Sequence, residues 1–219
     1  MEIYLVRHGQ SEANAGLTTY LDSPLTDLGR EQATVTAGAL TTAGITHAYV
    51  SPLVRTLQTI EPICERLDIK ATAFPSVCEY FSDKHPDFLT FKGLSPSEIV
   101  ERFPFVTISS EFSCDLPWWP QGFETRRSAY DRAVRVRDNL LRRYGQTDEK
   151  LLIVTHADPL GHLIEAFTHV EPNPEYPPWS DNCAITHLRI DDVDAPAVVL
   201  TQNDSTHLAA LPASPSGTR

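Results

Sequence analysis

Short apolar runs and longer amphipathic stretches alternate along much of the chain. Runs rich in Ile, Val and Leu, of the length of a buried strand, occupy residues 2–6, 47–51, 151–155, 184–190 and 197–202. Between the first three runs, apolar residues recur with the period of a helix that faces a core. Strands that alternate with helices indicate a parallel sheet covered on both faces. The pattern therefore predicts an α/β fold with three layers, α/β/α, around a mainly parallel central sheet.

Capping signals mark the ends of the helical stretches. Residues 26–44 predict a helix that Thr26 caps and Gly44 closes. Residues 51–67 predict a second helix, with Ser51 as its N-cap. Both helices would fall between the first three strands, as the alternating pattern requires.

A third amphipathic stretch, residues 124–145, predicts a long helix. Its apolar positions fall on one side, so that side is expected to pack on the sheet. Its polar side carries several arginines. We interpret them as the solvated face of the helix rather than a binding patch: Arg126, Arg127, Arg132, Arg135 and Arg137.

Residues 79–123 break the alternation and are rich in Pro, Phe and Trp. We interpret them as a cap-like insertion, packed over the edge of the sheet within one domain that spans the whole chain of 219 residues. Ser95 predicts the start of a short helix there. The insertion's aromatic residues are expected to form a small core of their own, with Trp118 and Trp119 as the pair best placed to reach a pocket. The tail, residues 211–219, is expected to be disordered.

Composition narrows the classes of function. A net charge of -11 argues against a nucleic-acid partner, because such proteins carry a basic face. No apolar run approaches a membrane span, and the first residues lack the features of a signal peptide, so we expect a cytoplasmic protein without a membrane partner. The four cysteines lie far apart, which predicts reduced, mostly buried thiols and neither a zinc site nor a disulfide framework. No other metal site and no cofactor are expected.

Charged and ionisable groups follow three of the predicted strands. Arg7 and His8 follow the first strand, Arg55 comes one helical turn after the second, and His156 follows the third. Ligands of open α/β sheets bind beyond the carboxyl ends of the strands. Arginine forks bind phosphate oxygens, and a neutral imidazole is a nucleophile, so the set favours phosphoryl transfer. Neither a Walker motif nor a dinucleotide-binding glycine motif is present.

The residues around these groups match a known family pattern. The sequence "LVRHGQSEAN" at 5–14, S-P-x-x-R-T-x-Q-T at 51–59 and "LLIVTHAD" at 151–158 resemble the histidine phosphatase superfamily, which also holds cofactor-dependent phosphoglycerate mutases. Residues 22–33 and 203–208 also look typical of the family. The resemblance spans nearly the whole chain except the insertion, and it implies the phosphoglycerate mutase-like fold.

The resemblance also implies roles for the four groups. His8 would be the nucleophile that becomes phosphorylated. Arg7 and Arg55 would clamp the phosphoryl oxygens, and His156 would join them in stabilising the transition state. The implied enzyme is a histidine acid-type phosphatase.

Three further residues are implied with the site. Asn14 and the backbone amide of Ala157 would contact the phosphate, and Glu79 would be the proton donor. Asp83 and Asp158 are alternatives to Glu79. Asp158 departs from the family pattern, because family members often carry glycines after the second histidine. A carboxylate near phosphate is repulsive unless it points away or meets a cationic group of the substrate.

The leading hypothesis is a metal-independent phosphomonoesterase acting on a small phosphorylated metabolite. A phosphoglycerate mutase is the first alternative, although the E-R-x-Y-G stretch that mutases of this family carry around their acid is absent. A non-catalytic phosphate-binding module of the same fold is the second. The identity of the metabolite and the oligomeric state stay open.

Overall fold

The computed structural model describes residues 1–80, 90–117, 124–172 and 179–213. Within these ranges, seven strands form one sheet in the order β4-β3-β2-β5-β1-β6-β7. Five strands run parallel, from β4 to β1, and β6 and β7 are antiparallel additions. The strands are β1 (Glu2–Arg7), β2 (His47–Val50), β3 (Ala71–Ala73), β4 (Val106–Ile108), β5 (Lys150–Thr155), β6 (Ile185–Arg189) and β7 (Val198–Asp204). The predicted mainly parallel sheet is confirmed, with β5 between β1 and β2 at its centre.

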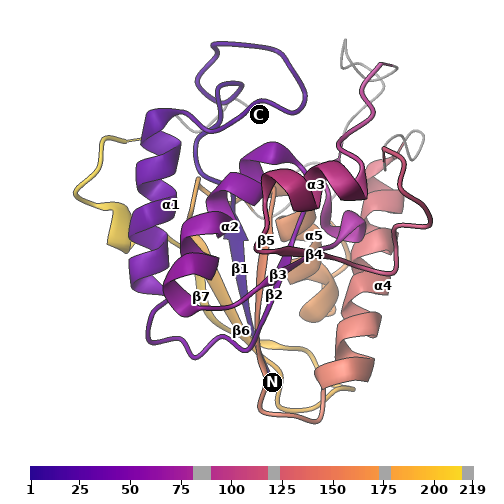
Figure 1. The fold of residues 1–219 in the computed structure, drawn as a ribbon. Coiled ribbons are helices and arrows are strands. Elements are labelled where there is room, and N and C mark those ends of the chain that lie inside the picture. The colour runs from indigo at the N-terminus through magenta and orange to yellow at the C-terminus, as the bar shows by residue number, and fades with distance from the viewer. Residues whose placement is uncertain (81–89, 118–123, 173–178, 214–219) are drawn as a thin grey trace.

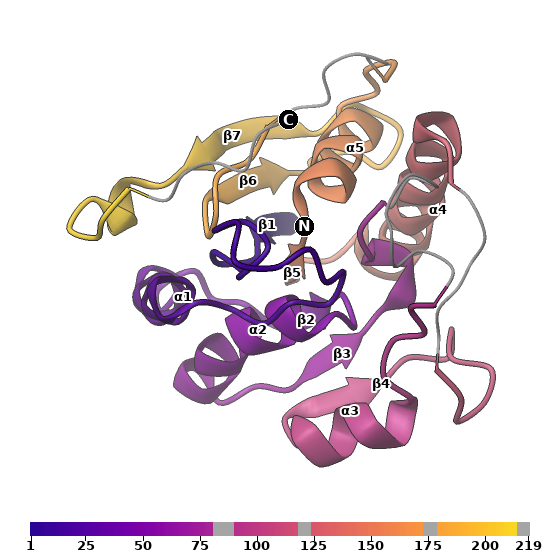
Figure 2. The same ribbon diagram turned by 90° about the horizontal axis from the view of Figure 1, so that it is seen from above.

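Helices cover both faces of this sheet (Figures 1 and 2). One layer holds α1 (Asp27–Ala39), α2 (Val54–Leu67) and the short α3 (Pro96–Arg102), and the other holds α4 (Arg126–Tyr144) and α5 (Ala157–Phe167). Alternation along the strands supplies both cores: Leu5 packs with the α4 and α5 side, and Val6 with the α1 and α2 side. The predicted three-layer α/β/α fold is confirmed. No helix in the described ranges has the length and apolar character to cross a bilayer.

Two predicted helix ends are wrong. The Thr26 hydroxyl caps α1 by accepting from Gly29 N, as predicted, but α1 ends at Ala39, and Gly44 lies in the turn beyond it with a φ of +71°. Ser51 does not cap α2, which begins only at Val54. The Asp22 carboxylate accepts the Val54 N–H at 2.6 Å instead, and this leaves the Ser51 hydroxyl for another partner.

The insertion is joined to the sheet. β4 pairs with β3 and becomes an edge strand, so this part of the segment extends the sheet. α3 begins with the predicted cap, because the Ser95 hydroxyl and the Glu98 side chain each bond the other residue's backbone. Phe103 lies in the core shared with α2 rather than in a core of the insertion alone. Trp118 and Trp119 lie outside the described residues, as does the chain from residue 214; the single-domain organisation stays a prediction.

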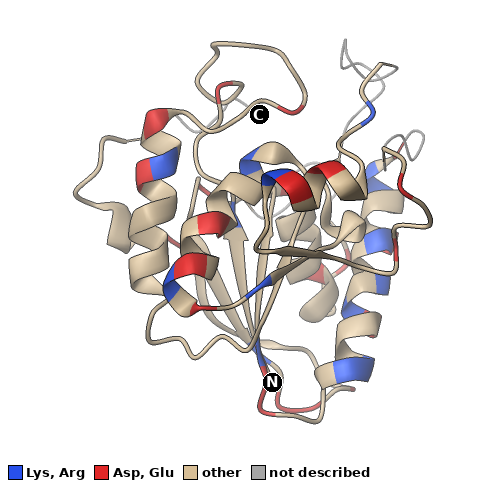
Figure 3. Cartoon of the chain, viewed as in Figure 1, with Lys and Arg blue, Asp and Glu red and all other residues tan. Residues whose placement is uncertain are grey.

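The arginines of α4, which is marked by several blue bands in Figure 3, do not all face solvent. Arg132 is only 9% exposed and bonds Glu124 and two backbone carbonyls. The Arg137 guanidinium donates to Ala166 O at 2.9 Å. The interpretation as a solvated face is therefore wrong for these two, because their guanidinium groups reach carbonyls of neighbouring elements.

Candidate active site

The carboxyl ends of β1, β2 and β5 bring the four expected groups together. Arg7 is the last residue of β1 and His8 follows it, His156 follows β5, and Arg55 lies in the first turn of α2 after β2. All four side chains are buried, with exposed fractions of 4% for Arg7, 2% for His8, 5% for Arg55 and 0% for His156. Two arginines and two histidines are thus withdrawn from water at one edge of the sheet.

The hydrogen bonds of His8 fix its tautomer. Nδ1 lies 2.7 Å from Gly9 O, which can only accept, so Nδ1 carries the ring hydrogen. Arg55 Nε–H donates to His8 Nε2 at 3.1 Å, so Nε2 carries a lone pair. Burial, then the charges of Arg55 and Arg7, hold the pKa of His8 well below its usual range. His8 is therefore a neutral imidazole whose unprotonated ring nitrogen is Nε2.

A close crossing of two glycines places the loop that follows His8. A Cβ on Gly9 would lie 2.5 Å from Gly29 O, and a Cβ on Gly29 would overlap Gln10 O. Only glycine lets the first turn of α1 approach this loop so closely. The glycines of the 5–14 and 22–33 motifs thus have one shared cause, a backbone contact that fixes His8.

Polar residues of the 51–59 motif tie the same loop to α2. Thr59 Oγ1 accepts the Gly9 N–H at 3.0 Å, and Gln58 Oε1 accepts the Leu25 N–H at 2.8 Å. The Ser51 hydroxyl lies 2.8 Å from His156 Nε2. Ser51, which does not cap α2, thus has His156 as its partner. The motif therefore positions both histidines in addition to supplying Arg55.

The segment 20–22 holds the Arg55 guanidinium in place. Arg55 Nη1 donates to Leu21 O at 2.7 Å. Burial lowers the pKa of Arg55, against the opposing effect of the negative charges of Glu79 and of Asp22, which is only 6% exposed. Burial raises the pKa of Asp22 itself to about 6.

Residues 179–182 bind Arg7, and sequence reasoning missed them. Arg7 Nη1 donates to Ser180 O at 2.7 Å, and its guanidinium lies 5.0 Å from the centre of the Trp179 ring. Asn182 Nδ2 donates to His8 O at 2.9 Å. Asn203 of the 203–208 motif anchors the segment, since its Oδ1 accepts the Asp181 N–H at 2.7 Å. The segment follows a proline-rich stretch of sequence, and only the match of 203–208 to the family pattern pointed to this part of the site.

Glu79 lies close to both His156 and Arg55. Its Oε2 is 3.8 Å from His156 Nδ1 and 3.9 Å from Arg55 Nη2. Burial and then the negative charge of Asp158 raise the pKa of Glu79 to about 7, against the opposing effect of the arginines. Asp158 contributes its charge from the first turn of α5, where a helix N-terminus favours an acidic residue. Asp83, the other alternative, lies outside the described residues.

A small pocket of about 110 Å³ opens onto these groups. Its described lining includes Arg7, His8, Arg55, Glu79 and Asn14, with Tyr20 at the more exposed side. The lining does not include His156 or Ala157 among the described residues. His156 packs behind it, with its ring 5.1 Å from that of His8, and Ala157 begins α5. The role of Ala157 as a phosphate contact stays a prediction.

Three of these side chains also have the spacing of metal ligands. One ligand atom each from His8, Glu79 and His156 lies within 4.8 Å of the others. Two buried guanidinium groups adjoin the same space, and Arg55 Nε–H already donates to His8 Nε2. Positive charge at this distance disfavours a divalent cation and favours an anion.

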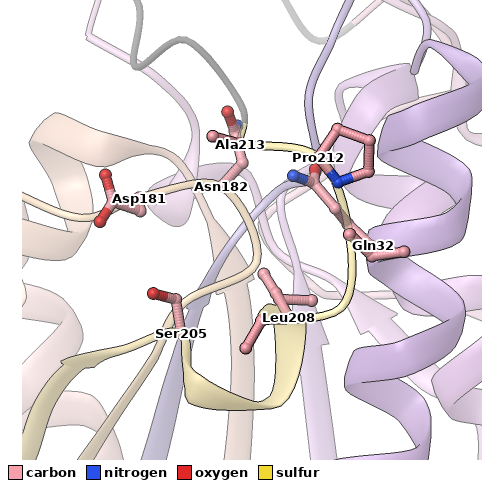
Figure 4. A pocket seen from close by; sticks show the side chains of 9 residues that line it. Gln32, Asp181, Asn182, Ser205, Leu208, Pro212 and Ala213 are labelled. Carbon is pink, nitrogen blue, oxygen red and sulfur yellow. The ribbon is translucent and has the colours of Figure 1, made fainter.

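Figure 4 shows a second, larger pocket. It has a volume of about 360 Å³ and is lined by Gln32, Asp181, Asn182 and residues 205–213 in part. Asn182 links the two pockets, because its side chain bonds His8 O. The described residues that line this second pocket include no arginine or lysine, so phosphate binding is favoured at the first.

Comparison with known proteins agrees with this geometry. The model of the histidine phosphatase superfamily (branch 1) matches residues 3–204. A protein of Serratia proteamaculans named probable phosphoglycerate mutase GpmB is 30% identical over 215 residues, which is 95% of each chain. Among solved structures, mycobacterial glucosyl-3-phosphoglycerate phosphatase has a TM-score of 0.68 at 23% identity and covers 93% of this chain and 99% of its own.

A second solved structure shares the fold to the same extent. Phosphoserine phosphatase from Entamoeba histolytica has a TM-score of 0.67 at 20% identity and covers 94% of this chain and 98% of its own. At these identities the two structures establish the fold alone. The family match over most of the chain goes further: this chain belongs to the histidine phosphatase superfamily, a family of phosphatase-type and mutase-type enzymes.

Proposed function

We propose that the chain is a metal-independent phosphomonoesterase that hydrolyses a small phosphorylated metabolite through a phosphohistidine on His8. The observation that carries the proposal is the neutral His8 ring, with its Nε2 lone pair directed toward Arg55 beside a pocket that Arg7 also lines. A neutral imidazole between two cations is suited to attack a phosphoryl group, whose charge the same cations stabilise.

Two buried nitrogen atoms support an anionic ligand. Arg7 Nε and His156 Nδ1 have no hydrogen-bond partner in the described parts of the chain. Burying an unsatisfied donor costs about 1–3 kcal/mol, and phosphoryl oxygens are acceptors. If the Ser51 hydroxyl donates to His156 Nε2, the neutral ring carries an Nδ1–H, which lies 3.8 Å from Oε2 of Glu79, a residue of the pocket lining.

The reaction proceeds in two half-reactions. The hydrogen bond from Arg55 to His8 Nε2 breaks, and Nε2 forms a bond to phosphorus as the bond to the leaving oxygen breaks. The Glu79 carboxylic acid gives that oxygen its proton. Water then attacks the phosphohistidine, Glu79 takes a proton from that water, and the P–N bond breaks to restore neutral His8. A carboxyl with a pKa of about 7 serves as acid and base in turn near neutral pH.

A phosphoglycerate mutase is the second candidate, because the curated relative at 30% identity is named a probable phosphoglycerate mutase. A mutase needs to protect its phosphohistidine from water. The two candidates thus differ in the fate of the phosphoenzyme. The mycobacterial relative of the same fold is described as a glucosyl-3-phosphoglycerate phosphatase, which supports hydrolysis as an outcome that this fold allows.

Phosphate release from a panel of phosphorylated metabolites, measured with chelator present, tests the proposal. We expect activity on a narrow set, unaffected by chelator and reduced at least about 10³-fold in His8→Ala. His187→Gln, which alters a half-buried histidine in β6 outside the described pocket lining, is the matched control. Isomerisation of phosphoglycerate without phosphate release would favour the mutase. Phosphate binding without turnover of any ester would favour a non-catalytic module.

A further inference from the structure

Three consecutive peptide carbonyls just before Glu79 are bound by side chains from other elements. Arg132 Nη1 of α4 donates to Ser76 O at 2.7 Å and to Cys78 O at 2.9 Å. Thr155 Oγ1, at the end of β5, donates to Val77 O at 2.6 Å. Side chains of α4 and β5 therefore hold the short 3₁₀ turn Pro75–Val77, which ends two residues before Glu79, the proposed proton donor.

Arg132 is itself held in one orientation. Its Nε and Nη2 each donate to one carboxylate oxygen of Glu124 at 2.7 Å, in a two-bond fork. The two side chains are 11% and 20% exposed, so water competes weakly for them. The guanidinium bonds a carboxylate with one edge and two carbonyls with the other, so it links α4 rigidly to the turn.

Glu79 has few contacts of its own that could fix it. Its one hydrogen bond within the described chain is from the neighbouring Tyr80 N–H to Oε1 at 3.0 Å. The distances from Oε2 to His156 and Arg55, 3.8 and 3.9 Å, are too long for hydrogen bonds. The position of the carboxyl relative to His8 therefore depends on the backbone that carries it.

We propose that Arg132, oriented by Glu124, is a positioning residue that sets the Glu79 carboxyl at the leaving-group side of the site. Arg132 is not part of the described lining of the pocket, so it acts through the turn and not on the substrate. This inference rests on the proposed function, in which Glu79 is the acid. A misplacement of a catalytic group by about 1 Å can reduce the rate on the order of 10²-fold, so loss of this link should have a measurable effect on turnover.

The test compares esters whose leaving groups need the acid to different degrees. kcat/KM is measured for phenyl, p-nitrophenyl and 2,4-dinitrophenyl phosphate, because it reports the half-reaction in which the leaving oxygen departs. In Arg132→Lys we expect a loss of about 10- to 100-fold on phenyl phosphate and less than about twofold on 2,4-dinitrophenyl phosphate. Glu124→Gln keeps the guanidinium and its carbonyl bonds, so we expect the same trend with a smaller loss.

Arg137→Lys is the matched control. Arg137 lies on the same helix and also donates to a backbone carbonyl, that of Ala166, but it does not contact the turn before Glu79. We expect no dependence on the leaving group from this change. Circular dichroism and binding of inorganic phosphate verify that each variant is folded, and Glu124→Gln carries the test if Arg132→Lys does not fold.

The outcomes separate the two proposals. An equal loss on all three esters in Arg132→Lys, or the same pattern in Arg137→Lys, overturns the positioning role. If Glu79→Gln shows the leaving-group dependence and neither Arg132→Lys nor Glu124→Gln does, only the positioning role fails. If Glu79→Gln itself shows none, the acid assignment fails and the role of Arg132 fails with it.

Discussion

The floor of the site and its acid side are built in different ways. The floor is formed at the ends of central strands: Arg7 ends β1, His8 follows it, and His156 follows β5. Arg55 completes the floor from the first turn of α2. On the acid side, Glu79 follows a 3₁₀ turn after β3, which lies next to the edge strand of the parallel part of the sheet. The floor is thus held by the sheet itself, and the acid by side chains from distant parts of the chain.

The two regions also shift proton affinity in opposite directions. On the floor, burial and the two arginines lower the pKa of both histidines well below their usual range. On the acid side, burial and Asp158 raise the pKa of Glu79 to about 7. Groups whose pKa values are pushed apart in this way take separate acid and nucleophile roles at one pH. Variants of each region should therefore have different effects.

The largest effect is expected from breaking the floor with Arg55→Lys. Lysine keeps the charge but lacks the planar fork whose separate Nε and Nη1 atoms donate to His8 and to Leu21 O. We expect kcat/KM to fall on the order of 10²- to 10³-fold on every ester, whatever its leaving group. Steady-state kinetics on the same three aryl phosphates measures this. A loss confined to poor leaving groups would contradict the assignment of Arg55 to the phosphoryl group.

Arg66→Lys provides the matched control for this change. Arg66 lies in the last turn of the same helix, and its guanidinium donates to the Thr41 hydroxyl at 3.1 Å. It is remote from the pocket lining. We expect its kinetics to stay within about twofold of the unaltered protein, in line with an exposed polar contact.

A smaller and more specific effect is expected on the acid side, in the pH dependence. The proposed donor acts while protonated, so kcat/KM should fall as pH rises through about 7, the raised pKa of Glu79. Asp158→Asn removes a charge that raises this pKa, so the falling limb should move to lower pH. Glu79→Gln should abolish this fall in kcat/KM, whereas a fall caused by ionisation of the substrate would remain in the variant. A limb that persists in Glu79→Gln would assign it to another group.

The floor could be predicted from sequence because its signals are local. A strand pattern followed by Arg7 and His8, or by His156, specifies both the element and the end of the sheet at which the side chain lies. The parallel sheet, its central strands and the helix caps at Thr26 and Ser95 follow from the same short-range patterns. The misassigned cap at Ser51 shows the limit, since a tertiary contact with His156 replaced the local one.

The supports of the site could not be predicted, because they join residues far apart in the chain. Arg132 reaches Ser76 and Cys78 across more than fifty residues. Helical periodicity places Arg132 beside the buried face of α4, but it does not identify these partners. Trp179 and Ser180 reach Arg7 from still further away. Contacts of this kind depend on how the layers pack, and a hydrophobic pattern specifies layers but not side-chain partners.

The smallest effect is expected at Trp179, which links the floor to a distant segment. Its ring lies 5.0 Å from the Arg7 guanidinium, and such contacts contribute about 0.5–2 kcal/mol. Trp179→Leu removes the π face while Ser180 O still accepts from Arg7, so Arg7 should lose orientation but not its place. We expect binding of inorganic phosphate, measured by calorimetry, to weaken by about 2- to 30-fold. Trp179→Phe keeps an aromatic face, so its phosphate affinity should be closer to that of the unaltered protein. The Trp179 indole N–H also donates to Asp181 at 3.0 Å. Equal weakening in both variants would assign the effect to this hydrogen bond and not to the ring over Arg7.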